Sequence, residues 1–327
     1  MNTLRWGLLS TANINRMTIA AAAASEQAVI VAVGSRDGAK AQAYASEHGI
    51  ERAHGSYEAL LADPDVDAVY VSLPNGMHHE WTMHALRAGK HVLCEKPYSR
   101  HPAEVEEAFD AAGEAGIVLM EAFMYRHHPQ TREIERLVRG GALGRVVSVT
   151  ARFTFPLRDL TNVRALADLA GGALMDIGCY CISGSRLVAG APVEVTAQQV
   201  TGSTGVDMGL YGTIRFADDV VSLCESSFLA PQRQFLEVVG EDAVLTVESP
   251  FRVDWPGETR ITRGTDVQVL DVQEADSYRL QLENMADAAA GAAPPRLGRE
   301  DALAQARAID ALYRAAAERR TVPVGAA

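Results

Sequence analysis

The sequence predicts an α/β protein with a doubly wound parallel sheet in its first third and an α+β region with an open, mostly antiparallel sheet after it. Two observations predict this class. In the first third, continuous apolar runs alternate with helical patterns, which is typical of parallel strands buried on both faces. After Gly144 apolar and polar residues alternate, as in "RVVSVTARFTF". That alternation is typical of strands with one solvated face.

The parallel region consists of apolar runs separated by helices. The predicted strands are Leu4–Leu9, Val29–Val33, Ala68–Leu73, His91–Cys94 and Ile117–Met120. The predicted helices are Ile19–Ala24, Asp37–His48, Ser56–Ala62, His78–Ala88 and Pro102–Ala115. Because parallel neighbours need a crossover between them, this order predicts a Rossmann-type sheet with helices on both faces.

The second region combines strands with a few helices. Helices are predicted at Gln130–Arg139, Met175–Ala189, Tyr278–Ala290 and Arg299–Arg319. Besides the alternating strand after Gly144, strands are predicted at Val193–Gly202, Leu210–Phe216, Val220–Phe228, Phe235–Val239, Val244–Val247, Thr259–Thr262 and Val267–Val272. We expect helices on one face of this sheet. The expected domains are 1–122 and 123–298, with the helix at about 299–319 packing back on the first.

Bulk properties narrow the class of protein. The chain has 327 residues, and its net charge of −12 disfavours nucleic acid or an anionic membrane as a partner. Its four cysteines contain no C-x-x-C, so we expect a reducing compartment. No apolar run approaches the roughly 20 residues of a membrane helix, and no leader precedes the first strand, so we expect a cytoplasmic protein. The adjacent histidine pairs lack metal-site spacing, and no metal is expected.

The turn after the first strand reads "LLSTANINRM". Nucleotide-binding turns usually read G-x-G-x-x-G, but here Ser10, Ala12 and Asn15 stand at the three glycine places. Small residues still allow close backbone approach of a pyrophosphate, and Asn13 is a good N-cap. The candidate pyrophosphate residues are Ser10, Thr11, Ala12, Asn13 and Ile14. The alternative is an ordinary capped helix.

The end of the second strand bears on the choice of cofactor. It reads "VGSRD", with Ser35 and Arg36 where an NAD-binding chain usually carries an acidic residue. A hydroxyl beside a forked guanidinium suits a 2′-phosphate, so we favour NADP over NAD. Asp37 follows, and it serves either an NAD ribose or the cap of the next helix.

Four motifs, in this order, carry a resemblance to a known family. They are "VSLPNGMHHEW" at Val71–Trp81, "CEKP" at Cys94–Pro97, "EAFMYRHHP" at Glu121–Pro129 and "GGALMDIGCY" at Gly171–Tyr180. Together they resemble the Gfo/Idh/MocA oxidoreductases, over essentially the whole chain. Within that family the chain is most similar to dimeric dihydrodiol dehydrogenases, NADP-dependent xylose dehydrogenases and sugar ketoreductases, whose members often lack the full glycine fingerprint.

Transfer of hydride to or from a carbinol needs a group that moves the hydroxyl proton. A tyrosine fits when a nearby ammonium lowers its pKa. The resemblance implies Tyr180 as acid/base and Lys96 as the cation that tunes it. Asp176 lies one helical turn before Tyr180 and can hold Lys96 or a sugar hydroxyl. We further expect that Pro97 is a cis-proline. The alternatives are a surface lysine and a core tyrosine.

The resemblance also implies further contacts. It places Leu73, Asn75, His78 and Glu95 against the cofactor. Arg126 faces the cofactor or substrate, or else forms a helix-capping salt bridge. Asn162 and Arg164 face the substrate, and they suit a polyhydroxylated ligand, a phosphate or a carboxylate.

The sequence therefore predicts an NADP-dependent enzyme acting on a carbinol or ketone of a sugar or cyclitol. Alternative substrates are a trans-dihydrodiol, an anhydro-sugar or a nucleotide-linked keto-sugar. A non-catalytic NADP-sensing regulator is the alternative outside enzymology. Because the open sheet face has no assignable cover, and relatives dimerise through it, we expect a homodimer or a higher homo-oligomer.

Overall fold

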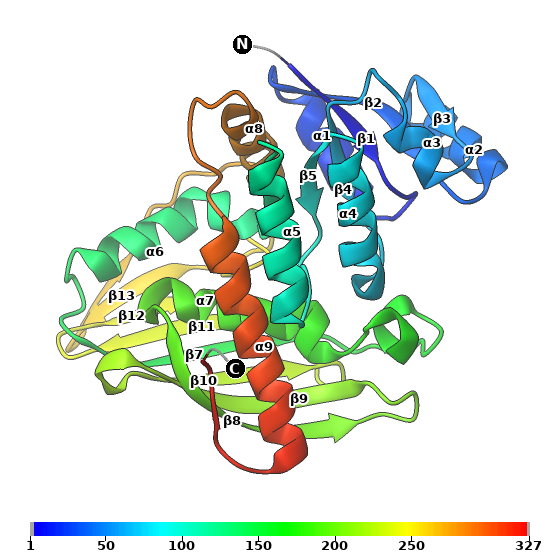
Figure 1. Ribbon diagram of the computed structural model, residues 1–327. Helices are drawn as coiled ribbons and strands as arrows, with labels where there is room; N and C mark the ends of the chain where they lie inside the picture. The colour runs from blue at the N-terminus through cyan, green and yellow to red at the C-terminus, as the bar shows by residue number, and fades with distance from the viewer. Residues whose placement is uncertain (1–2, 326–327) are drawn as a thin grey trace. The chain divides into compact units, whose positions relative to one another are not determined.

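The computed structural model describes residues 3–325 (Figure 1). The chain forms two compact units. The first holds the chain up to Ser99, then Ala103–His127 and Asp276–Ala302. The second holds Arg100–Pro102, His128–Ala275 and the chain from Leu303. The domain boundaries expected from the sequence stay a prediction.

The first unit contains a parallel sheet in the order β3-β2-β1-β4-β5-β6. Its strands are β1 (Leu4–Leu8), β2 (Ala28–Gly34), β3 (Arg52–His54), β4 (Ala68–Val71), β5 (His91–Cys94) and β6 (Leu119–Glu121). This is the Rossmann order, and it reverses direction between β1 and β4. Because strand β4 lies at the centre, all four of its residues are buried.

Helices cover both faces of this sheet. They are α1 (Asn15–Ala23), α2 (Gly38–His48), α3 (Tyr57–Leu61), α4 (His78–Arg87), α5 (Pro102–Glu114) and α8 (Ser277–Ala289), with short 3₁₀ turns at η1 (Asn75–Met77) and η2 (Met124–His127). Right-handed crossovers put α1 and α4 on opposite faces, because the strand order runs outward in opposite directions from β1 and β4. Helix α8 packs against α1.

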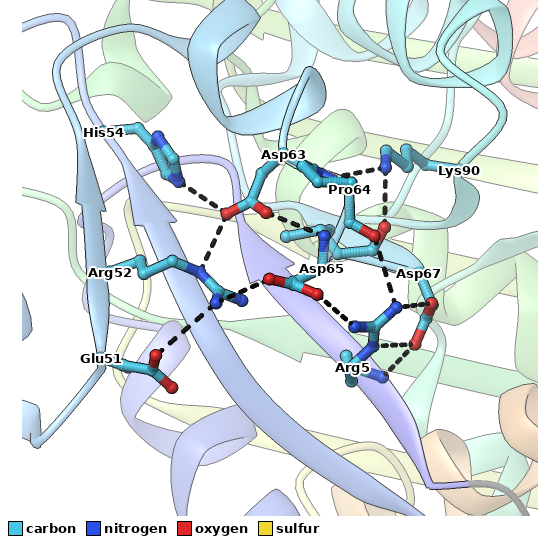
Figure 2. Close-up of polar contacts among 10 residues, drawn as sticks. Arg5, Glu51, Arg52, His54, Asp63, Pro64, Asp65, Asp67 and Lys90 are labelled. Carbon is cyan, nitrogen blue, oxygen red and sulfur yellow. Dashed lines mark hydrogen bonds and ion pairs between the residues drawn. The ribbon is translucent and has the colours of Figure 1, made fainter.

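An ion network joins the amino-terminal ends of the strands (Figure 2). Arg5 pairs with Asp67 at 2.8 Å, and Arg52 Nε lies 2.9 Å from Asp63 Oδ2. The buried Lys90 donates to the carbonyl oxygens of Asp63 (2.8 Å) and Val66 (2.7 Å), and burial lowers its pKa. Ligands of such sheets bind at the opposite, carboxyl ends, so this network serves stability.

The second unit contains a nine-stranded sheet in the order β14-β13-β12-β11-β7-β10-β9-β8-β15. Its strands are β7 (Val146–Thr154), β8 (Pro192–Thr201), β9 (Asp207–Phe216), β10 (Val221–Ser227), β11 (Arg233–Gly240), β12 (Val244–Val247), β13 (Thr259–Arg263), β14 (Asp266–Val269) and β15 (Val322–Pro323). Within residues 3–325, neighbouring strands of this sheet are antiparallel except β7 and β10, which run parallel.

Helices pack against one face of this sheet. They are α6 (Pro129–Arg139), a π-helical turn η5 (Leu174–Gly178) that continues into α7 (Cys179–Ala189), and the part of α9 (Arg299–Glu318) that follows Ala302. Short 3₁₀ turns lie at η3 (Val163–Ala165) and η4 (Ala167–Leu169), and η6 (Ala217–Asp219) joins β9 to β10. Figure 1 shows α7 against the sheet. On the other face, Tyr211 and Leu223 are 41% and 53% exposed.

The predicted fold class is confirmed: a Rossmann sheet and a mostly antiparallel open sheet. Strand β3 was missed because Arg52–His54 is short, polar and half-buried, so it forms no apolar run. Strand β15 (Val322–Pro323) was missed because two residues are too few to form an apolar run. Helix α1 begins four residues before the expected Ile19, at Asn15.

Candidate active site

The turn that lacks the fingerprint glycines lies where the strand order reverses, between the carboxyl ends of β1 and β4. Side chains hold this turn together. Ser10 Oγ donates to the carbonyl oxygen of Ser72, 3.0 Å away, and accepts from the N–H of Ala12 at 3.1 Å. The fully buried Asn15 donates to the carbonyl oxygen of Ser10 at 2.8 Å. Two of the three residues in the glycine places therefore bond to the backbone of the turn or of Ser72, directly after β4.

The same turn fits a dinucleotide pyrophosphate. Helix α1 begins directly after it with Ile14 as N-cap, and neither Asn13 nor another described side chain caps it. The first turn contains no acidic residue. The N–H groups of Asn15, Arg16 and Met17 already donate to backbone carbonyl oxygens, so α1 attracts an anion mainly through its dipole. The expectation that Asn13 caps the helix was wrong, because the helix starts one residue later than that cap requires.

Asp37, after the end of β2, caps the next helix. Its side chain accepts from the N–H of Lys40 at 3.1 Å and caps α2. Ser35 Oγ accepts from the N–H of Asp37 at 3.2 Å, and Arg36 is exposed. Of the two uses expected for Asp37, the structure has the helix cap. The residues that remain for a ribose or its phosphate are a hydroxyl and a guanidinium, which fit a 2′-phosphate.

The E-K-P segment follows β5 directly. The Lys96–Pro97 peptide bond is cis, as expected. Glu95 accepts a short hydrogen bond from the hydroxyl of Tyr70, a fully buried residue of β4 whose pKa burial raises. The other carboxyl oxygen of Glu95 accepts from the N–H of Lys96 at 3.3 Å. Glu95 is thus fixed at the carboxyl edge of the sheet, next to Lys96.

His78, which the resemblance placed against the cofactor, is the first residue of α4. It is fully buried, with Nε2 2.8 Å from the carbonyl oxygen of Leu73 and Nδ1 3.0 Å from that of Pro97. Burial, helped by the ammonium of Lys96, lowers its pKa. A neutral ring has one N–H, so it donates to one of these carbonyls at a time. Asn75 begins the 3₁₀ turn η1 beside it.

Arg126 lies in the 3₁₀ turn η2 and is buried. Its Nη1 lies 3.5 Å from Asp301 Oδ1, in the first turn of α9. Of the two interpretations given for Arg126, the structure contains the salt bridge, and its acidic partner Asp301 suits the positive end of the helix dipole.

Three predicted substrate residues are linked in the second unit. Asn162 Oδ1 accepts from the backbone N–H of Arg164 at 3.1 Å. Arg164 Nε donates to Asp176 Oδ2 at 2.7 Å. The guanidinium is therefore neutralised by a carboxylate, and the pair presents donors and acceptors side by side. Such an arrangement suits hydroxyl groups, which both donate and accept, better than an anion.

Tyr180 is the second residue of α7 and is buried. Its ring packs against Phe153 and Phe251, with centroids 5.7 Å and 5.6 Å away, and these two rings stack on each other at 5.8 Å. The predicted helix is present, but Asp176 lies in its π-helical turn, which is wider than an α turn and shifts Asp176 relative to Tyr180. Gly178 permits close packing on β10, because a Cβ there would lie 2.8 Å from Ser226 Oγ.

Asp207, at the start of β9, holds the beginning of this helix and was not predicted. Its Oδ2 accepts from the N–H of Leu174 at 2.7 Å, and its Oδ1 accepts from the hydroxyl of Tyr313 at 2.9 Å. Gly172, with φ of 125°, leaves room for it, because a Cβ there would lie 2.0 Å from Asp207 Oδ1. No local sequence pattern marks Asp207, since it meets its partners only through the fold.

Comparisons with known proteins agree with these observations. Residues 4–123 match the Gfo/Idh/MocA model, described as an oxidoreductase family with an NAD-binding Rossmann fold. Residues 131–246 match the C-terminal domain of the same family. The chain belongs to the Gfo/Idh/MocA oxidoreductase family.

Three relatives represent the branches that the sequence motifs indicated. An NADP(+)-dependent D-xylose 1-dehydrogenase of Haloferax volcanii is 41% identical over 317 residues, 96% of this chain and 97% of the relative. A trans-1,2-dihydrobenzene-1,2-diol dehydrogenase of Xenopus laevis is 34% identical and covers 75% of each chain. The crystal structure of a 3-ketoreductase of Actinomadura kijaniata with NADP and TDP-benzene is 32% identical, with a TM-score of 0.90, 96% of this chain and 98% of that one.

The resemblance inferred from the motifs is thus confirmed, as is the assignment to dehydrogenases and reductases. In this Gfo/Idh/MocA chain, Lys96 belongs to the first unit, and Asp176 and Tyr180 to the second. The site roles of individual residues stay a prediction. Between residues 3 and 325 no helix is long and apolar enough to cross a membrane, and no cluster of three or more metal-ligating side chains is present.

Asp207 gives this family member a testable pH dependence. Burial raises its pKa from 3.8 to about 6. A raised folded-state pKa stabilises the protein below the unfolded value, and the contribution is lost as pH rises through the folded value. We expect the wild type to gain about 1 kcal/mol relative to Asp207→Asn between pH 7 and pH 5. Denaturant melts at several pH values measure this, and a stability difference that stays flat with pH would contradict it.

Proposed function

We propose that this protein is an NADP-dependent oxidoreductase that acts on a carbinol or ketone of a neutral sugar or cyclitol. The observation that carries the proposal is the retention of Lys96, Asp176 and Tyr180 in a chain similar over nearly its whole length to an NADP(+)-dependent xylose dehydrogenase. The neutralised Arg164–Asp176 pair favours hydroxyl-bearing substrates over sugar acids or phosphates. D-Xylose is the first candidate to try.

The proposed chemistry divides between the cofactor and the chain. NADP, when bound, supplies or accepts the hydride. Tyr180 takes the hydroxyl proton in oxidation and returns it to the carbonyl oxygen in reduction. Lys96 stabilises the phenolate and orients the substrate oxygen. Asp176, Arg164 and Asn162 hold neighbouring hydroxyl groups.

The solved structures of the Actinomadura 3-ketoreductase support this choice of residues. Two of them carry single substitutions, one a lysine changed to alanine and the other a tyrosine changed to phenylalanine. The two altered residues are as far apart in that sequence as Lys96 and Tyr180 are here. The same pair of residue types at the same spacing is what the proposal requires.

The preference for NADP rests on Arg36. We expect Arg36→Ala to raise the dissociation constant of NADP by about tenfold or more and that of NAD by less than about twofold, because only NADP carries the phosphate that the guanidinium binds. Cofactor fluorescence titration measures both constants. Arg87→Ala, which removes another exposed arginine of the same unit, is the control. Equal losses for both cofactors would overturn the assignment.

A substrate panel tests the proposed function. The protein is mixed with NADP⁺ and neutral aldoses or cyclitols, and in separate arms with a trans-dihydrodiol, or with NADPH and anhydro-sugars or nucleotide-linked keto-sugars. Absorbance of the reduced cofactor is followed. Turnover only in the separate arms would show that the substrate is a dihydrodiol, an anhydro-sugar or a nucleotide-linked keto-sugar and not a neutral aldose or cyclitol. Tight NADP binding without turnover in any arm would favour the non-catalytic sensor.

We also propose that the enzyme is a cytoplasmic homodimer or a higher homo-oligomer. All four cysteines are buried free thiols, which fits a reducing compartment. The open face of the nine-stranded sheet exposes Tyr211 and Leu223 beside a hollow of about 1300 Å³. Exposed apolar groups of this kind usually mark an interface. Light scattering of the purified protein measures the oligomeric state.

A further inference from the structure

One peptide plane next to Lys96 is held at both edges by buried side chains. The carbonyl oxygen of Pro97 lies 3.0 Å from His78 Nδ1. The N–H of Tyr98, which belongs to the same peptide group, donates to Glu121 Oε1 at 2.7 Å. His78 is fully buried, and Glu121 is 2% exposed. These partners come from the start of α4 and the end of β6.

This arrangement fixes where Lys96 stands. The proline ring holds φ of Pro97 near −65°, so two soft torsions, ψ of Lys96 and ψ of Pro97, separate the Cα of Lys96 from this peptide. The proline that follows Lys96 already restricts the first of them. Glu121 holds the N–H edge of that peptide, and His78 holds its carbonyl edge when the ring proton is on Nδ1, so ψ of Pro97 is held too. The backbone of Lys96 is therefore tied to β6 through Glu121 and to α4 through His78. With the proton on Nε2, His78 donates instead to the carbonyl oxygen of Leu73, 2.8 Å away, and Glu121 alone holds the peptide.

Burying a carboxylate at a strand end costs free energy unless the carboxylate is hydrogen-bonded. Glu121 pairs in register with Cys94 of β5, one residue before Glu95. At this place an apolar residue would fill the sheet edge without the cost of burying a charge. The carboxylate instead satisfies a backbone N–H two residues beyond Lys96.

We propose that Glu121 is a positioning residue for Lys96, acting with His78 on the opposite edge of the Pro97–Tyr98 peptide. This rests on the proposed function only in that Lys96 then serves the reaction. A displacement of about 1 Å in a reacting group can cost two orders of magnitude in rate. Glu121 therefore controls turnover by fixing the backbone that carries the ammonium.

The three lysines of this chain provide a test that needs no substrate. Lys40 is exposed, Lys90 is buried at the opposite edge of the sheet, and Lys96 is the target. Acylation by acetic anhydride, read by mass spectrometry across a pH series, gives the reactivity of Lys96 relative to Lys40. Lys90 reports whether the sheet stays folded.

We expect Glu121→Leu to change the relative reactivity of Lys96 by about threefold or more and to lower kcat by about tenfold, with NADP affinity within twofold. Glu121→Gln keeps a carbonyl acceptor in the same place and should stay near the wild type in both measurements. If Glu121→Leu does not fold, shown by a reactive Lys90, Glu121→Asp replaces it. That variant withdraws the acceptor by one methylene and should change Lys96 in the same direction.

The outcomes separate the two proposals. Unchanged Lys96 reactivity in folded Glu121→Leu or Glu121→Asp protein overturns the positioning role. Equal effects of Glu121→Gln and Glu121→Leu also overturn it, because charge would then matter and the hydrogen bond would not. Altered Lys96 reactivity without turnover on any substrate, in wild type as well, supports the positioning role and refutes the proposed function.

Discussion

Replacing Tyr180 by phenylalanine is expected to lower kcat by a factor of about 10² or more, because the reaction loses the group that moves the hydroxyl proton. The ring should keep its place, since its contacts with Phe153 and Phe251 do not involve the hydroxyl. Binding of NADP, measured by fluorescence titration, should therefore change by less than about twofold, as for a group that acts on the proton alone.

The control for this variant is Tyr57→Phe, which removes a hydroxyl from a buried tyrosine of helix α3. It should leave the steady-state rate within about twofold of the wild type, as expected for a residue outside the chemistry. A Tyr180→Phe enzyme that turns over at the wild-type rate would mean that the proton travels by another route, and the assignment of Tyr180 would fail.

The second large effect is expected from Lys96→Met. An ammonium near a phenol favours the phenolate, so its loss should raise the pH at which oxidation becomes efficient and lower kcat at neutral pH by about tenfold or more. The measurement is the pH profile of kcat for oxidation. Methionine retains much of the apolar stem of lysine, so packing of that stem is largely preserved.

Lys40→Met is the matched control, because it removes the same charge from the exposed surface of α2. Its pH profile should coincide with that of the wild type. If Lys96→Met also leaves the profile unshifted, the lysine does not tune the acid/base group. Only three of the 30 basic residues are lysines, so a lysine at position 96 is unusual for the composition of this chain.

Periodicity predicted the architecture because burial on one face or on both faces leaves a pattern in the sequence. The apolar run His91–Cys94 is strand β5 with the same bounds. Pairing leaves no such pattern: β7 and β10 are parallel neighbours, which alternation of polarity cannot reveal because it does not name a partner strand. Strand β3 lacks a signal for a different reason, since its three residues are half-buried at the sheet edge.

The candidate site, too, was only partly predictable from the sequence. Lys96, Tyr180 and Asp176 lie in short motifs and were found from the sequence alone. Their supports were not: Asp207 meets Leu174, and Glu121 meets Tyr98, through hydrogen bonds between distant parts of the chain. Glu121 stood inside a recognised motif without a role, because only the three-dimensional register shows which N–H it faces.

The serine and asparagine of the β1–α1 turn bear on how such proteins are found. A search for spaced glycines selects turns with a flexible backbone, whereas here Ser10 and Asn15 form hydrogen bonds that hold the turn in place. A survey based on glycine spacing would therefore miss this chain. A criterion built on small side chains and an uncapped helix start would recover it.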